Sequence, residues 1–391
     1  VNIWGEESAP TEPVLFDKET GQSVTYTVTH TPTAGQQTIT GIAFYRTYAN
    51  AAGYFLINST PVPLSGGTAK LTDASTEPVT TTALESSEWD LPPASPANLT
   101  YAGNGFYVVS SGKDLVFSEP YKPHAWPYRM TLPSAIVGIT MAEGGILVTT
   151  TGLPYLISGA HPSQMSQTFL PAEQAGWSDT AIARVDGSAV YASNDGLVRV
   201  SGGQPSIAAS QALFRRKDWR DRYGTARLNL RLAHHDGLLL GLVDPSYPAV
   251  ATATPFLINL DAGSGALTRI DVGQPLYGAS VSGVTDQLFA LTATGFAEFT
   301  GGTALTYEWW SGDKLHPSPV NYAAGVVDAV GSATLYVYAD GALRHTAAVS
   351  GRTAFRLPAG DPAYRWSVRL VGTAVVREIS LGASFAELKG V

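Results

Sequence analysis

The chain contains no cysteine, so neither a disulfide framework nor a thiolate metal site can hold it together, and packing alone has to stabilise it. Charged side chains make up only 14% of its 391 residues, against roughly 25% in an average soluble protein. No apolar run reaches the roughly 18 residues of a membrane-spanning helix, and no basic-then-apolar signal opens the chain. Because the chain starts without Met, at residues that look like a strand already under way, we expect a fragment or a processed product.

Excess positive charge is also missing. The formal net charge is -8, which argues against a general nucleic-acid binder, because phosphate neutralisation needs clustered Lys and Arg. One basic cluster exists, and acidic residues at Asp218 and Asp221 interrupt it. It consists of Arg215, Arg216, Lys217, Arg220 and Arg222.

What the chain does have is a repeated hairpin. Five times an apolar strand runs into a turn and a second apolar strand, at 106–118, 146–159, 189–202, 238–261 and 288–302. The hairpins start 40, 43, 49 and 50 residues apart. Repeats of roughly 40 to 50 residues built from short strands are typical of β-propeller blades, so the chain is predicted to be all-β with a propeller.

Turn residues support these hairpins. In four of the five, a glycine can supply the positive φ that a tight turn needs: Gly112, Gly152, Gly196 and Gly295. The hairpin at 238–261 turns through 244–246 instead, with the Asp236-Gly237 turn just before it. Helical periodicity is confined to 209–219, where one short helix is expected.

The two ends of the chain differ from the repeat. Alternating strands at 23–30, 38–47 and 53–58 predict an N-terminal fibronectin-type-III-like β-sandwich, and the proline-rich stretch 91–96 leads out of it. Strands at 331–338, 353–357, 365–370 and 374–381 predict a small C-terminal β-sheet unit. We therefore expect three domains: the sandwich at 1–98, the propeller at 99–310 and the C-terminal unit at 311–391.

No catalytic, cofactor-binding or metal-binding residues are predicted. The adjacent His234 and His235 point to opposite sides of a strand, which makes a shared metal difficult. The segment 193–197 resembles the Asp-containing turns of sialidase propellers, and an Asp-Gly turn needs no further role. Carboxylates for glycoside hydrolysis would have to come from a set in which sequence gives no reason to pair any two. The set is Glu119, Glu143, Glu173, Asp179 and Asp195.

One segment is specific beyond a generic blade. Residues 116–127 hold three prolines and three aromatic residues, in the order Phe-Ser-Glu-Pro at 117–120 and Pro-His-Ala-Trp-Pro at 123–127. Further motifs follow in order: Gly152-Leu-Pro-Tyr155, Gly159-Ala-His-Pro-Ser163 and Tyr191-Ala-Ser-Asn-Asp-Gly-Leu197. Three more lie upstream, at 5–10, 45–47 and 89–93. In these motifs the chain resembles a family of tailed-phage virion structural proteins, most similar to the tail nozzle, or tail hub, of short-tailed phages.

The resemblance implies a non-enzymatic structural component of the virion, made in the bacterial host cytoplasm. In that family the protein forms a homo-oligomeric ring, a hexamer, that contacts other tail proteins such as the adaptor and fibres. The ring continues the DNA ejection channel, through which DNA passes without specific binding. The family also carries blade strands ahead of the sandwich, which this chain, beginning inside the sandwich, would receive from another piece.

Within the proline-rich segment and just after it, four residues are predicted assembly contacts: Tyr121, His124, Trp126 and Tyr128. Core packing is the simpler interpretation for each ring taken singly. Two alternative functions stay open, a cell-surface propeller that binds or cleaves carbohydrate and a tail-tip protein that contacts the host receptor. Trp309 and Trp310 could stack on sugars in either alternative, while a buried interdomain hinge is the simpler interpretation.

Overall fold

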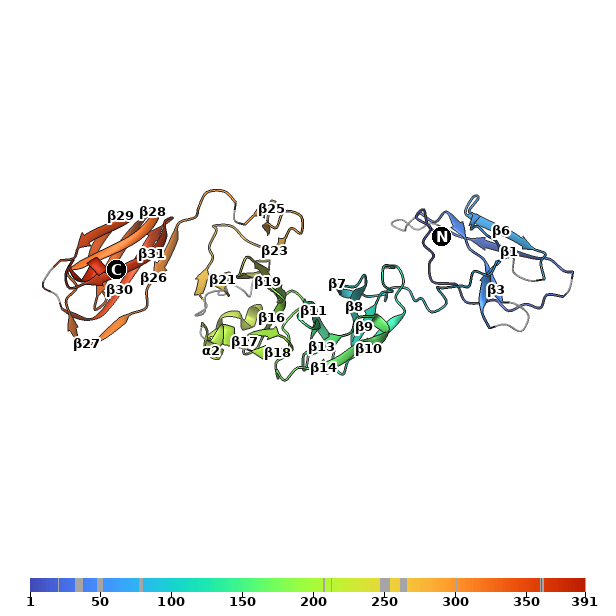
Figure 1. Ribbon diagram of the computed structural model, residues 1–391, viewed down its shortest axis with the longest axis horizontal. Helices are drawn as coiled ribbons and strands as arrows, with labels where there is room; N and C mark the ends of the chain where they lie inside the picture. The colour runs from blue at the N-terminus through green and yellow to red at the C-terminus, as the bar shows by residue number, and fades with distance from the viewer. Residues whose placement is uncertain are drawn as a thin grey trace. The chain divides into compact units, whose positions relative to one another are not determined.

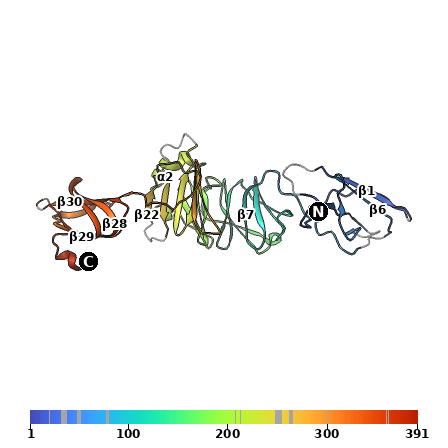
Figure 2. The same cartoon turned by 90° about the horizontal axis from the view of Figure 1, so that it is seen from above.

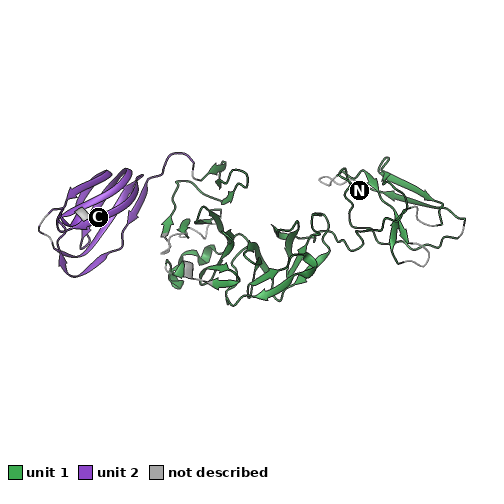
Figure 3. Cartoon of the chain, in the orientation of Figure 1, with its two compact units in different colours: residues 1–299 green, residues 300–391 purple. Residues whose placement is uncertain are grey.

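A computed structural model describes residues 1–19, 21–31, 38–47, 52–76, 80–206, 208–211, 213–246, 254–260, 266–299, 301–358, 360 and 362–390. The chain forms two compact units, 1–299 and 300–391 (Figure 3). Strands dominate both, which confirms the predicted all-β class.

In the described residues before Ala97, the N-terminal part has three antiparallel strand pairs around a small apolar core. Phe44, Ile57 and Ala69 are its buried residues. In β1 every second residue is exposed, as the alternation in the sequence predicted. Figures 1 and 2 both show β1 and β6 side by side. The pairs are β1 (Val24–Thr29) with β6 (Thr68–Asp73), β2 (Gly41–Ile42) with β5 (Val62–Pro63), and β3 (Tyr45–Thr47) with β4 (Tyr54–Leu56).

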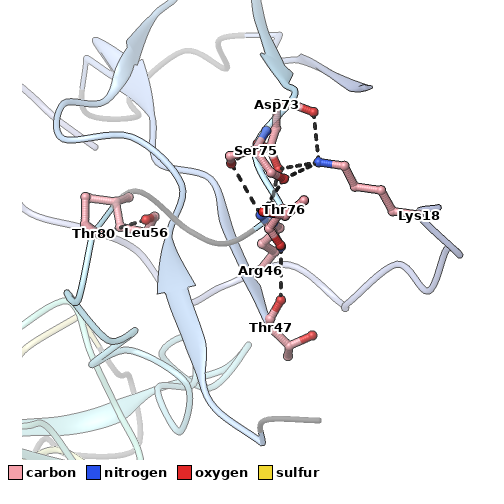
Figure 4. Close-up of polar contacts among 8 residues, drawn as sticks. All are labelled: Lys18, Arg46, Thr47, Leu56, Asp73, Ser75, Thr76 and Thr80. Carbon is pink, nitrogen blue, oxygen red and sulfur yellow. Dashed lines mark hydrogen bonds and ion pairs between the residues drawn. The ribbon is translucent and has the colours of Figure 1, made fainter. Parts of the chain in front are cut away.

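A buried ionic cluster ties this part together (Figure 4). The carboxylate of Asp73 lies 2.8 Å from Nε of Arg46 and 3.5 Å from Nζ of Lys18. Burial by itself raises the pKa of Asp73, but hydrogen bonds from Ser75 and the two cations outweigh it, so the pKa lies below its ordinary value. The charged carboxylate therefore stabilises the fold and links three separate segments of the chain.

The described residues between 97 and 299 form five successive antiparallel sheets. Each of the five predicted hairpins supplies the second and third strands of one sheet. We number these sheets as blades. The first blade is β7 (Ala97–Tyr101), β8 (Tyr107–Ser111), β9 (Asp114–Phe117) and β10 (Tyr128–Thr131). The second is β11 (Ile136–Ala142), β12 (Gly145–Thr150), β13 (Tyr155–Ser158) and β14 (Ser166–Phe169), with the short η1 (Pro162–Gln164) before β14. The third is β15 (Ile182–Val185), β16 (Ser188–Ser193), β17 (Gly196–Ser201) and β18 (Gln204–Ser206). The fourth is β19 (Leu230–His235), β20 (Leu238–Val243), β21 (Phe256–Asn259) and β22 (Ala266–Arg269), and the fifth is β23 (Gly278–Val281), β24 (Leu288–Thr292) and β25 (Gly295–Glu298).

These sheets pack as propeller blades do. The first strands of consecutive sheets contact one another, β7 with β11, β11 with β15, β15 with β19 and β19 with β23. A separate apolar cluster fills each space between neighbouring blades. Because every blade buries its faces against the next one, the repeat predicted from hairpin spacing is a β-propeller array.

Between the third and fourth blades lie two short helices, α1 (Ala208–Gln211) and α2 (Arg216–Tyr223), followed by η2 (Gly224–Ala226). The prediction of one helix over 209–219 was therefore wrong. Arg215 precedes α2 with an extended backbone, at ψ 149°, which separates the two helices. The ring of Trp219 on α2 is fully buried and stacks on Trp177 at a centroid distance of 5.2 Å. Ala212 lies outside the described residues.

The predicted turn glycines are confirmed in three of four hairpins. Gly112, Gly196 and Gly295 have positive φ, whereas Gly152 does not. The connection from β12 to β13 is a longer one, in which the Thr150 hydroxyl accepts a hydrogen bond from the Gly152 amide. Side-chain hydrogen bonding there replaces the tight glycine turn.

The C-terminal unit is a six-stranded sheet built on one long hairpin, β28 (Ala324–Ala339) with β29 (Ala342–Arg356). The two halves of β28 pair with different strands, β31 (Val375–Gly382) and β30 (Ala363–Gly372). A bulge at Gly331, with φ of +99°, separates the halves. The sheet also holds β26 (Tyr307–Trp310) and β27 (Lys314–Val320), and η4 (Glu387–Gly390) ends the described chain.

One of the two expected domain borders lies next to the start of a sheet and the other lies inside a sheet. The first blade begins at Ala97, next to the border expected at 98. The border expected at 310 falls inside the C-terminal sheet, because β26 pairs with β30 and the compact unit starts at 300. The proline-rich stretch 91–96 contains neither helix nor strand.

Candidate functional site

The four predicted assembly residues lie on and just after the loop that follows β9. Tyr121 is the exposed one, at 82%. Its backbone has a φ of +61°, and its amide donates a hydrogen bond to the Gly105 carbonyl at 2.7 Å. A Cβ at Gly105 would meet the Tyr121 ring at 2.7 Å, so the ring packs closely against this glycine. Most of the Tyr121 side chain nevertheless faces solvent.

Trp126 and Tyr128 turn inward instead. Trp126 packs with Val109 and Val116 in the outer core of the first blade, which leaves little ring surface for a partner chain. The Tyr128 hydroxyl donates a hydrogen bond of 2.7 Å to a carboxylate oxygen of Glu119. Burial first, and then this hydrogen bond, raise the pKa of Tyr128 to about 12. Trp126 therefore packs within the first blade, whereas the half-buried Tyr128 ring packs between the first two blades and meets His161 edge-on at 5.5 Å.

His124 helps to join the blade to the N-terminal part. Its ring meets Trp89 edge-on at 5.5 Å, and its Nδ1 lies 3.9 Å from a carboxylate oxygen of Glu6. Lys122 lies 4.5 Å above the Trp89 ring and 3.2 Å from Glu85. The Trp126 amide donates to the Asp90 carbonyl at 3.0 Å. The stretches 89–93 and 123–127 thus meet in one joint, beside a cavity of about 420 Å³.

The second cavity, of about 470 Å³, lies beside the turns of the second and third blades and α2. Asp195, whose side chain is 7% exposed, receives ion pairs of 2.7 Å from Arg216 and Arg220. Gln174 donates to the same carboxylate at 2.7 Å. The turn that resembles sialidase propellers therefore anchors helix α2, and it neutralises part of the basic cluster.

Of the carboxylates considered for glycoside hydrolysis, the fold brings two to one cavity. Glu173 and Asp195 both line it, whereas Glu119, Glu143 and Asp179 are not among its lining residues. Both oxygens of Asp195 are held by arginine or glutamine side chains. This carboxylate is thus committed to a structural network. Sequence offered no reason to pair them, because Glu173 lies in the connection from β14 to β15 and Asp195 in the turn from β16 to β17.

The two adjacent histidines face different neighbours, as strand alternation predicted. Nε2 of His234 lies 3.3 Å from a carboxylate oxygen of Asp186, and Nδ1 of His235 lies 3.9 Å from one of Asp286. The described residues hold no group of three or more potential metal ligands. Nor is any helix in the described part long and apolar enough to cross a membrane.

Among the comparisons with known proteins, only the comparison with solved structures gives matches. No family model and no curated protein matches the chain. An exo-β-1,3-galactanase from Phanerochaete chrysosporium aligns at 7% identity over 73% of this chain and 95% of its own, with a TM-score of 0.28. The N-terminal domain of Nup159 aligns at 10% identity over 72% and 90%, with a TM-score of 0.32, and YCF48 from Cyanidioschyzon merolae at 12% over 62% and 64%, with 0.25. Likeness at this level carries no information about function.

Proposed function

We propose that the chain is a non-enzymatic structural subunit of a phage tail, the nozzle or tail-hub ring that continues the DNA ejection channel. The resemblance of its motifs to virion proteins supplies the tail assignment. Other tail proteins, such as the adaptor and fibres, are then its partners, a homohexamer is the ring that the family implies, and the phage tail is its location. The structure supports this proposal through surfaces that suit assembly.

The observation that carries the proposal is the open edge of the fifth blade. Each of the first four blades has four strands, whereas the fifth has three in the described residues, with β25 paired to β24 alone. On β25 the Phe296 ring is 75% exposed. An unpaired edge with an exposed ring is a template for a strand from another chain. This edge suits a protein that works in an assembly.

The charge arrangement fits a channel through which DNA slides. Arg216 and Arg220 are paired with Asp195, Lys217 is paired with Asp221, and Arg231 lies 3.1 Å from Asp244. Cations that are already paired within the chain attract phosphate weakly. With a net charge of -8, the subunit offers DNA little to bind.

The test is the mass of the full chain in solution over a range of concentrations, measured by multi-angle light scattering. A ring of about six copies of the 41.1 kDa chain is the expected species. Phe296→Lys places a charge on the open edge and is expected to reduce assembly, whereas Leu228→Lys, at another exposed apolar side chain, is the matched control. A monomer at every concentration, with the wild-type chain and both variants alike, would contradict the proposal.

A glycan-cleaving propeller is the alternative that the second cavity raises. It requires Glu173 to act with Asp195, whose oxygens are occupied by arginine and glutamine donors. Under our proposal, neither the wild-type chain nor Glu173→Gln hydrolyses more polysaccharide than buffer alone does. Hydrolysis that Glu173→Gln abolishes would favour the alternative.

A further inference from the structure

The C-terminal sheet carries a cluster of aromatic side chains on its solvent side. In the register of the sheet Trp310 of β26 is opposite Arg369 of β30, and Arg369 is opposite Tyr336 of β28. Tyr338, two residues along β28, points to the same side because strand side chains alternate. We call this set, with Glu308, the Trp310 platform.

Contacts hold the platform in one arrangement. The Trp310 and Tyr338 rings stack with centroids 5.1 Å apart and an interplanar angle of 28°. The guanidinium of Arg369 lies 5.4 Å from the Trp310 centroid and 5.0 Å from the Tyr336 centroid. Such aromatic pairs and cation–π contacts are favourable and directional. The rings are therefore positioned before any ligand arrives.

Glu308 fixes the arginine and the indole together. Its carboxylate accepts two hydrogen bonds from Arg369, at 3.0 and 2.9 Å, and one of 2.6 Å from Nε1 of Trp310. A bidentate arginine–carboxylate pair sets the orientation of both groups. These hydrogen bonds from Arg369 and Trp310 hold the pKa of Glu308 below its ordinary value, so the pair is charged at neutral pH.

The platform is not part of the hydrophobic core of its unit. Leu335 and Val337 of β28 and Leu370 of β30 point to the other side of the sheet and are buried there. Trp310 remains 50% exposed although it is stacked. The expectation that Trp309 and Trp310 form a buried hinge is therefore wrong, because β26 is a strand of the sheet and displays the Trp310 ring. Three aromatic rings on a solvent face indicate a binding surface.

The chemistry of the platform selects the class of ligand. Flat rings pack against the C–H faces of sugar rings, and the carboxylate and guanidinium beside them offer acceptors and donors for hydroxyl groups. Because Glu308 neutralises Arg369, the platform has little attraction for a polyanion such as single-stranded DNA. We propose that the Trp310 platform binds a glycan, a function separate from the ring assembly proposed above and carried by a different unit of the chain.

The experiment uses the full chain and affinity electrophoresis in native gels that contain dextran, laminarin, xylan, arabinogalactan, galactomannan or bacterial lipopolysaccharide. At least one polysaccharide is expected to retard the chain. Trp310→Ala is expected to lower that affinity about tenfold, since loss of one stacking ring is worth on the order of one decade in the dissociation constant. Trp310→Phe keeps a ring and is expected to retain most of the affinity.

Matched controls separate binding from folding. Trp309→Ala removes the neighbouring tryptophan, which is 46% exposed on the opposite side of the strand, and is expected to leave retardation unchanged. Circular dichroism of each variant shows whether the sheet is intact, and Trp310→Phe keeps the proposal testable if the alanine variant does not fold. Absence of retardation with every polysaccharide, or equal loss in Trp309→Ala and Trp310→Ala, would overturn the proposal.

Single-stranded DNA provides the competing arm. A fluorescent dT oligonucleotide is added to the wild-type chain and to Trp310→Ala, and its anisotropy is measured at low and moderate salt. The glycan proposal predicts no binding that depends on Trp310. Binding to the oligonucleotide that the alanine variant loses, without retardation by any polysaccharide, would assign the platform to nucleic acid instead.

Discussion

Two tryptophans of this chain stack in nearly the same way and do different work. Trp219 stacks on Trp177 at 5.2 Å and Trp310 stacks on Tyr338 at 5.1 Å, yet Trp219 is fully buried whereas Trp310 is half-exposed. Both have charged neighbours in the sequence, Arg220 beside Trp219 and Glu308 near Trp310. Stacking geometry alone therefore does not separate a core ring from a binding ring. The difference lies in how much of each ring the surrounding side chains cover.

The largest expected effect comes from removing the buried ring. Trp219→Ala leaves a cavity among Trp177, Phe214 and Phe256 and strips the hydrogen bond from Nε1 to the Ser193 carbonyl, 2.9 Å away. The free energy of unfolding should fall by about 3–5 kcal/mol. Trp310→Ala, the control, should cost about 1 kcal/mol or less. Urea unfolding followed by circular dichroism measures both, and equal losses would break the comparison.

The next prediction concerns the strand that supports the platform. At Gly372 an added Cβ would lie 2.6 Å from the Cα of Ala333, so Gly372→Val forces β30 away from β28. We expect about 2–3 kcal/mol of destabilisation, confined to the C-terminal unit. Amide hydrogen exchange should accelerate within 301–390 and stay unchanged around Trp219. Faster exchange in both units would show that they are not separate folding units.

A smaller effect is expected at the anchor of helix α2. Asp195→Asn weakens the ion pairs with Arg216 and Arg220, whose side chains are about half exposed and so are partly screened by solvent. The free energy of unfolding should fall by about 1 kcal/mol, and the emission of buried Trp219 should shift because the helix loosens. Lys217→Ala, which removes a fully exposed pair on the same helix, is the control and should change neither.

The smallest effect is a pH dependence at the platform. The pKa of Glu308 is lowered in the folded chain by Arg369 and Trp310, so its ion pair is present above the ordinary carboxyl value of 4.5 and is lost as pH falls through the lower, folded value. Trp310 fluorescence should change only in that acidic window. Glu308→Gln should remove the transition, while a transition that persists in this variant would assign it to another group.

Much of the fold could be predicted from sequence, because each blade hairpin has a local signal of two apolar runs around a turn. Apolar runs around Asp195-Gly196 and Thr294-Gly295 predicted strands and turns that the structure confirms. The Asp186-Gly187 turn, with positive φ at both residues, carries the same signal and joins β15 to β16. The prediction of a positive φ at Gly152 was wrong, because a hydrogen bond to the Thr150 hydroxyl shapes the connection from β12 to β13.

The candidate sites were harder to predict, because they depend on which strands meet. Nothing near Trp310 in the sequence shows that Arg369 and Tyr336 will be its neighbours across two ladders. A weak signal did exist, the alternation of Tyr336 and Tyr338 with buried Val337. Likewise, the pairing of Arg220 with Asp195 joins a helix to a turn 25 residues away.

We propose that this chain forms a ring around a channel, and electron microscopy of the assembled species tests this proposal most directly. Class averages of negatively stained particles, prepared at the concentration at which light scattering finds the largest mass, should show a closed ring with a central hole. Phe296→Lys should deplete these rings. Single particles of one chain's size, or open filaments without a hole, would contradict the account.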